Sequence, residues 1–215
     1  MWHLWNIWIG AFLLGFTGAM MPGPLMTYVL DESTHRGVRT GPLTILGHAV
    51  LEAVMVALLA LGVAQFLKIP WVLAGIAFLG GAVLLWMGAG MLWQAPRMTL
   101  ATAAARSGRL HPVVAGVVIS LANPYWTFWW VSVGAGYVVL AARYGFAGVL
   151  TFFAGHILAD LTWYTAVSGA VAGGRRLMTD RIYRGIVGIC ALVLLGFGIF
   201  FLWSGFGFLQ APAPH

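Results

Sequence analysis

Six apolar stretches, each long enough to cross a bilayer, constrain the fold of this chain more than any other feature. A transmembrane helix needs about 20 mostly apolar residues, and it satisfies its own backbone hydrogen bonds where water is absent. Charged residues make up 7% of the chain, against about 25% in soluble domains, so they are too few to coat a water-facing surface. We therefore expect an all-α integral membrane protein with six transmembrane helices. The stretches are Asn6–Leu30, Gly41–Leu67, Pro70–Trp93, Pro112–Val138, Phe146–Ala172 and Gly185–Phe206.

Lysine and arginine residues are divided unequally between the two sides of such a protein. With six spans, both termini share a side with the second and fourth connections, which carry only Lys68 and Arg143. The opposite side carries nine: Arg36, Arg39, Arg97, Arg106, Arg109, Arg175, Arg176, Arg181 and Arg184. Because the more positive side faces the cytoplasm, we expect a multi-pass protein of the plasma (inner) membrane with both termini extracytoplasmic. The same rule explains the net charge of +6 without a nucleic-acid partner.

The second and fifth apolar stretches share one short pattern. The second has His48 four residues before Glu52, and the fifth has His156 four residues before Asp160, each histidine following a glycine. The first and fourth stretches also match, because proline interrupts both. The chain therefore reads as two copies of a three-helix unit, and an odd number of spans per copy makes this an inverted repeat.

This organisation predicts a single membrane domain over residues 1–215. Its parts are a first three-helix repeat at 1–93, a cytoplasmic linker at 94–111, a second three-helix repeat at 112–206 and a tail at 207–215. The first and fourth helices should be broken.

Proline marks the expected breaks in those two helices. Each proline removes a backbone donor and clashes with the preceding turn. Unwound backbone is tolerated inside a membrane only where it is buried in protein or lines a cavity, and transporters bind substrates at such breaks. Most aromatic residues nearby, including those at 125–130, are assigned to packing or lipid contact. The candidate substrate-binding residues are Pro22, Gly23, Pro24, Asn123 and Pro124, with Trp163 and Tyr164 one turn after the acid of the fifth stretch.

Each histidine shares a helix face with its acid, because residues four apart are neighbours on a helix. Ionisable groups deep in a membrane are costly and indicate a functional site, and removal from water favours the uncharged form of a carboxyl group. His48, Glu52, His156 and Asp160 are therefore candidate proton-coupling residues. Two alternatives stay open: the same four side chains could ligate a divalent metal ion, or they could hydrogen-bond only to hold helices together.

Several function classes are excluded. The single cysteine, Cys190, supports neither a thiolate metal site nor a redox carrier, which needs two thiols. No nucleotide-binding loop, nucleophile elbow or metalloprotease motif occurs. We therefore expect a transporter rather than an enzyme, with no cofactor. Its expected partners are a small-molecule substrate and the lipid bilayer, while the formation of a homo-oligomer stays open.

The order of these features resembles the lysine exporter (LysE/RhtB-type) family of small amino-acid exporters. The resemblance is carried by Pro22-Gly23-Pro24, by the basic loop from Arg36-Gly37 to Gly41 and Gly47, and by Asn123-Pro124. It implies a secondary active exporter of amino acids or similar small amphipathic solutes, and the buried His/acid pairs add the expectation that export is coupled to protons. The alternative function is a transporter of divalent metal or other inorganic cations that uses the paired histidines and carboxylates.

Overall fold

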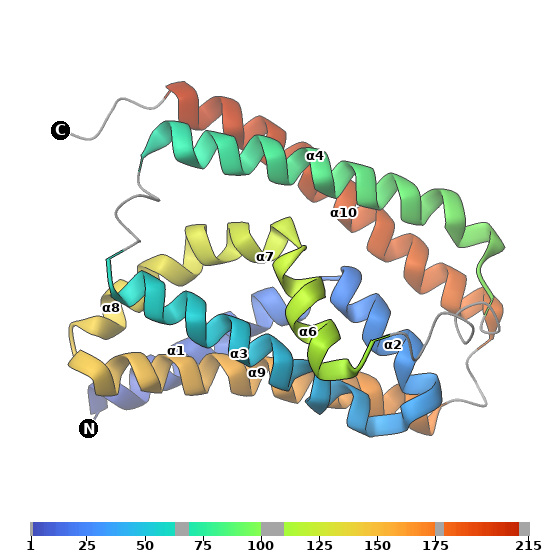
Figure 1. Cartoon of the computed structure of the whole chain (residues 1–215), viewed down its shortest axis with the longest axis horizontal. Helices are drawn as coiled ribbons and strands as arrows, with labels where there is room; N and C mark the ends of the chain where they lie inside the picture. Colours follow the sequence, from blue (N-terminus) through green and yellow to red (C-terminus); the bar gives the residue numbers. More distant parts are fainter. Residues whose placement is uncertain (1, 63–68, 100–109, 175–178, 211–215) are drawn as a thin grey trace.

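Helices make up nearly all of the chain that the structure describes. The structure is a computed structural model, and it describes residues 2–62, 69–99, 110–174 and 179–210. Within these ranges no β-strand occurs, so the predicted all-α class is confirmed. The elements (Figure 1) are α1 (Trp2–Ala19), α2 (Pro24–Arg36), η1 (Gly37–Arg39), α3 (Thr40–Ala60), α4 (Pro70–Gln94), η3 (Ala95–Arg97), α6 (Pro112–Leu121), α7 (Pro124–Trp129), η4 (Trp130–Gly134), α8 (Ala135–Ala142), α9 (Gly145–Gly173) and α10 (Asp180–Gln210).

Two helices are interrupted at the prolines that the sequence indicated. Residues 20–23 separate α1 from α2, and residues 122 and 123 separate α6 from α7. Proline is the first residue of both α2 and α7. The N–H of a first helical residue makes no bond within the helix, so its absence in proline costs nothing there. The side chain of Asn123 caps α7 by accepting a hydrogen bond from the backbone N–H of Tyr125 at 3.1 Å. Gly23 precedes α2 and has no side chain to cap it.

Four helical segments are long and apolar enough to cross a membrane. They are Pro24–Ala60, Pro70–Arg97, Gly145–Gly173 and Asp180–Gln210. The first of them contains α2 and α3, joined by η1, which begins at Gly37, a residue whose φ of 72° favours glycine. The other predicted spans are divided into pieces by their breaks, so the layout of six crossings stays a prediction.

Helix ends differ slightly from the predicted borders between repeats. α4 and η3 together extend to Arg97, into the predicted linker at 94–111, of which residues 100–109 lie outside the described residues. α10 continues to Gln210, into the predicted tail at 207–215, of which residues 211–215 also lie outside them.

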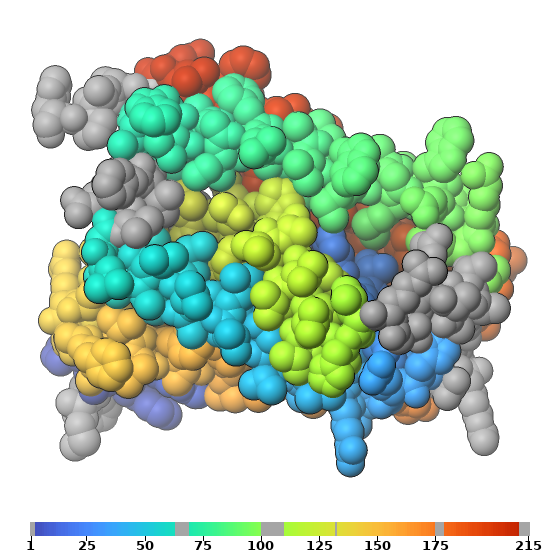
Figure 2. Space-filling view, viewed as in Figure 1, coloured from blue at the N-terminus to red at the C-terminus, as the bar shows by residue number. Residues whose placement is uncertain are grey.

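Helix packing divides the molecule into a main body and one separate pair (Figure 1). In the body, α1 packs along α9, α6 packs against α3, and α3 also contacts α9. α4 and α10 pack along each other at one side, and α4 reaches the body through α7. In the space-filling view of Figure 2, α4 forms a ridge beside the surface built by α3, α6 and α9. Large apolar side chains point outward, as at Leu79 and Trp86, which are 71% and 77% exposed, and this suits a lipid surrounding.

Candidate functional site

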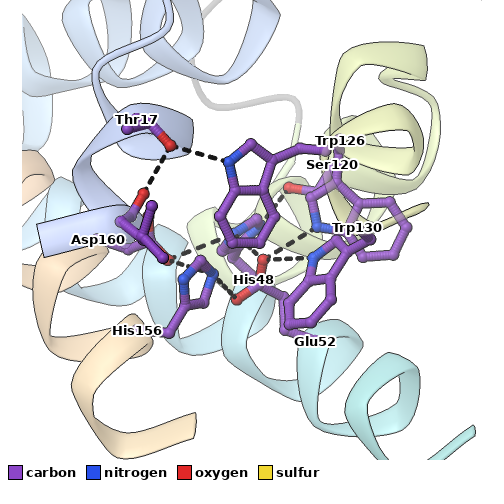
Figure 3. Close-up of polar contacts among 10 residues, drawn as sticks. Thr17, His48, Glu52, Ser120, Trp126, Trp130, His156 and Asp160 are labelled. Carbon is purple, nitrogen blue, oxygen red and sulfur yellow. Dashed lines mark hydrogen bonds and ion pairs between the residues drawn. The ribbon is translucent and has the colours of Figure 1, made fainter. Parts of the chain in front are cut away.

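Two adjacent helices bring the predicted His/acid pairs face to face. His48 and Glu52 come from α3, and His156 and Asp160 come from α9; all four side chains are buried (Figure 3). The His48 Nε2 atom lies 3.0 Å from Glu52 Oε1 and 3.8 Å from Asp160 Oδ2. The His156 Nε2 atom lies 3.1 Å from Glu52 Oε2 and 3.6 Å from Asp160 Oδ2. Each histidine therefore approaches both acids, and the four side chains form one cluster rather than two separate pairs.

Glu52 is held by donors from another part of the chain. Its Oε1 atom accepts hydrogen bonds from the indole nitrogens of Trp126 at 3.1 Å and Trp130 at 2.9 Å. These tryptophans are four residues apart, which places them on one face after the Asn123 break. Trp130 also begins the π-helical segment η4, a local widening that is frequent at functional sites. With His48 added, three nitrogen atoms surround one carboxylate oxygen.

Asp160 is much less well bonded. Its side chain is buried, and its Oδ2 atom has no hydrogen-bond partner among the described residues. The two histidine nitrogens nearest to this atom, at 3.6 and 3.8 Å, are beyond the usual length of an N–H···O bond. A buried polar atom without a partner is costly. Oε2 of Glu52 also lacks a hydrogen-bond partner among the described residues, so each acid of the cluster has one oxygen that could receive a proton, a cation or a water molecule.

The two histidines also differ in their surroundings. The Nδ1 atom of His48 lies 2.7 Å from the Oγ atom of Ser120 on α6, which fixes the plane of the ring. Both ring nitrogens of His156 lack a hydrogen-bond partner within the described part of the chain. Its ring stacks instead on Trp129, with ring centroids 4.8 Å apart. One histidine is thus fixed by a hydrogen bond and the other by aromatic packing.

A small cavity connects this cluster to both helix breaks. Its volume is about 50 Å³, which is room for a few water molecules, since one water needs about 10–15 Å³ of such space. It is lined by residues of α1, α2, α3, α6, α7 and α9 and of the two breaks: Gly18, Ala19, Met21, Gly23, Leu25, Met26, His48, Glu52, Ser120, Asn123, Tyr125, Trp126, Trp129, His156, Asp160 and Tyr164.

Some of the predicted substrate-binding residues line the cavity and others do not. Gly23, Asn123 and Tyr164 line it together with the four members of the His/acid cluster. Of the described residues, Pro22, Pro24, Pro124 and Trp163 are not part of its wall. Pro24 and Pro124 begin the two helices that lead away from the breaks, so they shape the cavity through the backbone. Trp163 packs instead against the cluster of buried apolar residues around Ala19 and Leu25.

Sequence reasoning missed the residues that hold the His/acid cluster in place. It assigns Trp126 and Trp130 to packing or lipid contact and gives Ser120 no role. The spacing of the two tryptophans, four residues apart directly after a break, is the signal that could have indicated a shared target. For Ser120 the sequence offers only a polar residue in an apolar helix, three residues before the break.

The cluster also has the composition of a metal site. One ligand atom each from His48, Glu52 and Asp160 lies within 4.8 Å of the other two. A nitrogen and two carboxylate oxygens suit zinc or manganese. The two indole N–H groups bind Glu52 Oε1, so a metal ion would be ligated by Oε2 of this side chain, which has no hydrogen-bond partner among the described residues.

Comparisons with known proteins identify one family and several relatives. The family model of the LysE type translocators matches residues 16–205. An uncharacterised membrane protein of Pseudomonas aeruginosa is 32% identical over 191 residues, which cover 84% of this chain and 87% of that protein. A candidate amino acid efflux protein of Bacillus subtilis is 24% identical, covering 93% of this chain and 97% of its own length. A leucine efflux protein of an Enterobacter species is 30% identical over 65% of each chain. No solved structure matches.

Proposed function

Because this chain belongs to the LysE type translocator family, we propose that it exports amino acids or similar small amphipathic solutes in exchange for protons. Members of this family are membrane transporters and not enzymes, and this chain is a membrane transporter with several apolar helices. Family membership establishes a transporter. The identities of the coupling ion and of the solute are what the proposal adds.

One observation carries the proposal: four buried ionisable side chains and two helix breaks meet at one cavity. Ionisable groups at membrane depth are costly, and a chain keeps them where they bind ions or substrates. Free backbone groups at a break serve the same purpose. If the four ionisable side chains only held helices together, they would not need to face the same cavity as the two helix breaks.

We further propose that residues 1–93 and 112–206 form an inverted repeat. Helix contacts support this, because α1 of the first half packs on α9 of the second, and α6 of the second packs on α3 of the first. The glycines before the two histidines have matching neighbours. A Cβ on Gly47 would lie 1.8 Å from the carbonyl oxygen of Val113 in α6, and one on Gly155 would lie 2.6 Å from that of Trp8 in α1.

The proposed transport cycle requires the cavity to open to each side of the membrane in turn. Hydrogen bonds near the first break hold it closed on one side. The Tyr125 hydroxyl donates to the backbone oxygen of Thr17 at 3.1 Å, and the Trp129 indole donates to the Thr17 hydroxyl at 3.0 Å. These bonds join the end of α1 to α7. Alternating access would break and remake them as the two halves move.

A zwitterionic solute suits the polar groups of the opened cavity. Its ammonium group could meet the carboxylate of Asp160, which lacks a partner at Oδ2. Its carboxylate could meet the first turn of α2, where no side chain caps the backbone N–H groups and where Leu25 and Met26 line the cavity. The apolar side chains of the same two residues offer contact to an apolar solute side chain.

Charge balance within the His/acid cluster allows proton exchange. With both acids ionised and both histidines protonated, the cluster is neutral, so a proton added or removed changes its charge by one unit. Entry of a cationic group from the solute then favours loss of a proton, and departure of that group favours its return. This linkage is what proton-driven export requires.

Transport of a divalent cation is the second candidate function. It is favoured by the close ligand atoms of His48, Glu52 and Asp160, although the indole bonds to Oε1 of Glu52 leave only the other oxygen of that carboxylate for an ion. For either function we propose a plasma-membrane location with both termini extracytoplasmic, in accordance with the distribution of Lys and Arg.

Transport assays in proteoliposomes test the proposal. A pH gradient imposed across vesicles that contain the purified chain should drive accumulation of at least one amino acid from a panel that includes leucine and lysine. A protonophore should abolish it. Glu52→Gln and Asp160→Asn should fold and lose this accumulation, while Asp180→Asn, at the start of α10 and outside the cavity, should keep it.

Metal ions form the second arm of the same assay. Flux of Mn²⁺ or Zn²⁺, together with stabilisation of the purified chain by that ion, would favour the cation transporter if no amino acid is moved. Normal amino-acid accumulation by both cluster variants would show that the cluster serves only to hold the helices together.

A further inference from the structure

We propose that Trp129 is a positioning residue that links the His/acid cluster to the contact that closes the cavity. Its indole N–H holds Thr17 near the end of α1, and its ring face holds His156 on α9. Movement at either partner therefore reaches the other through one rigid side chain. This inference rests on the proposed export, and it names the residue through which a change at the cluster opens the cavity.

Thr17 holds Trp129 in one direction. The Thr17 hydroxyl accepts the indole N–H of Trp129 at 3.0 Å and donates to the backbone oxygen of Leu14 at 2.6 Å. A hydroxyl has one hydrogen to give, and here it is used on Leu14. The lone pairs of the same oxygen are therefore turned toward Trp129, which is itself buried and can only donate.

His156 depends on the other side of the same indole. The two rings are stacked, with their centroids 4.8 Å apart and their planes 28° apart. Trp130 and Phe152 also face the imidazole, at 5.3 and 5.9 Å. Both nitrogens of His156 lack a hydrogen-bond partner among the described residues. The position of this ring is therefore set by aromatic packing, in which Trp129 is its nearest partner.

The helix that carries Trp129 joins the same two regions a second time. Tyr125 and Trp129 are four residues apart on α7, and both donate to Thr17. The residues directly after each of them, also four apart, both donate to Glu52. α7 lies between the break at 122 and 123 and the π-helical segment η4. Irregular backbone at both ends allows a short helix to tilt as a unit, so its contacts to α1 and to the cluster would change together.

This arrangement couples the cluster to the cavity wall in both directions. An occupant of the cluster that turns the His156 ring takes away the surface on which Trp129 rests, and this weakens the bond to Thr17. An intact bond between Trp129 and Thr17 keeps His156 where it is. By thermodynamic linkage the two effects are equal in size.

Thiol labelling of the full-length chain in lipid nanodiscs tests this role. Ala19 lines the cavity and is 4% exposed, so a thiol introduced by Ala19→Cys in a Cys190→Ser background reacts with a water-soluble reagent when the cavity opens. Trp129→Phe keeps a ring for His156 and removes the N–H. We expect it to speed labelling by about two- to tenfold, the effect of one hydrogen bond. An unchanged rate would overturn the proposal.

Two controls separate this effect from general loosening of the chain. The native Cys190 is buried on α10 and is not part of the cavity wall, so it should label no faster in Trp129→Phe than in the parent chain. Trp71→Phe, at an exposed position at the start of α4, should leave the labelling of Ala19→Cys unchanged. Equal acceleration at Ala19→Cys and at Cys190 would show a merely structural role and overturn the proposal.

Combined variants test the link between the two partners of Trp129. Thr17→Val removes the acceptor, and His156→Gln removes the stacked ring, with His156→Leu in its place if that variant does not fold. Each should speed labelling of Ala19→Cys, and the pair should speed it by less than the product of the two factors, because either change already frees Trp129. In a Trp129→Phe background, Thr17→Val should add nothing. Factors that multiply in full would overturn the link.

Labelling needs no solute, so its outcome is separate from that of the transport assay. Faster labelling in Trp129→Phe, together with a parent chain that moves no solute, would support the link and contradict export. Export by the parent chain, with labelling that Trp129→Phe leaves unchanged, would overturn the link and leave export standing.

Discussion

Gly47 and Val113 are packed so closely that a Cβ on Gly47 would lie 1.8 Å from the Val113 carbonyl oxygen. This contact presses α3 against α6 one residue before His48. It thereby brings the His48 ring to Ser120, with which it shares a 2.7 Å hydrogen bond. The glycine that precedes the histidine is thus part of what builds the cluster, although it touches none of its charged atoms.

Substitution of this glycine should disrupt the contact. We expect Gly47→Ala to destabilise the chain by about 3 kcal/mol or more, because backbone atoms must move to make room in a packed interior. Gly75→Ala is the matched control on α4, since a Cβ there meets no atom within 4 Å. Thermal unfolding of the two variants in lipid nanodiscs measures the difference. Equal unfolding temperatures for both variants and the parent chain would contradict the helix contact.

The two indole bonds to Glu52 predict a second effect. Trp130→Phe keeps an aromatic ring but removes one donor, and we expect a loss of about 1–3 kcal/mol of folding free energy together with slower transport. Trp71→Phe is a suitable control, because Trp71 is 69% exposed at the start of α4, and it should change stability by less than about 0.5 kcal/mol. An unchanged transport rate and stability in Trp130→Phe would show that Glu52 does not depend on this bond.

A hydrogen bond between residues that do not line the cavity ties α10 to α2. The Tyr183 hydroxyl donates to Oδ1 of Asp31 at 2.7 Å, in the second half of α2. We expect Tyr183→Phe to destabilise the chain by about 1.5–3 kcal/mol, the range for a hydrogen bond to a charged group. Tyr144→Phe, at an exposed position between α8 and α9, should have no measurable effect. Thermal unfolding compares the two, and an effect of equal size in both would argue against the α2–α10 bond.

Orientation in the membrane can be tested by cysteine labelling in intact cells. In a Cys190→Ser background, a cysteine introduced by His35→Cys should resist a membrane-impermeant thiol reagent, because it lies on the arginine-rich side. A cysteine introduced by Tyr144→Cys should react. Both positions are exposed, so access to the side chain itself is not limiting. The opposite labelling pattern would reverse the proposed orientation.

Features carried by single segments are determined by the sequence itself. Apolar length predicted helices, proline predicted the interruptions before Pro24 and Pro124, and the spacing of His48 and Glu52 predicted a shared helix face. Each of these depends on neighbours within a few residues. These local features can therefore be predicted from the sequence, and the structure agrees with the predictions.

The hydrogen bonds of the two acids, in contrast, arise from contacts between distant segments. Trp126 and Trp130 lie 74 and 78 residues beyond Glu52, and no local pattern indicates that their indoles reach one oxygen of that side chain. Asp160 has the same histidine spacing as Glu52 but receives no such donors at Oδ2. Composition and periodicity thus specify which groups are buried and on which helix. Their bonding depends on how the helices pack across α3, α7 and α9, because hydrogen bonds act over about 3 Å and are set by the relative positions of whole helices.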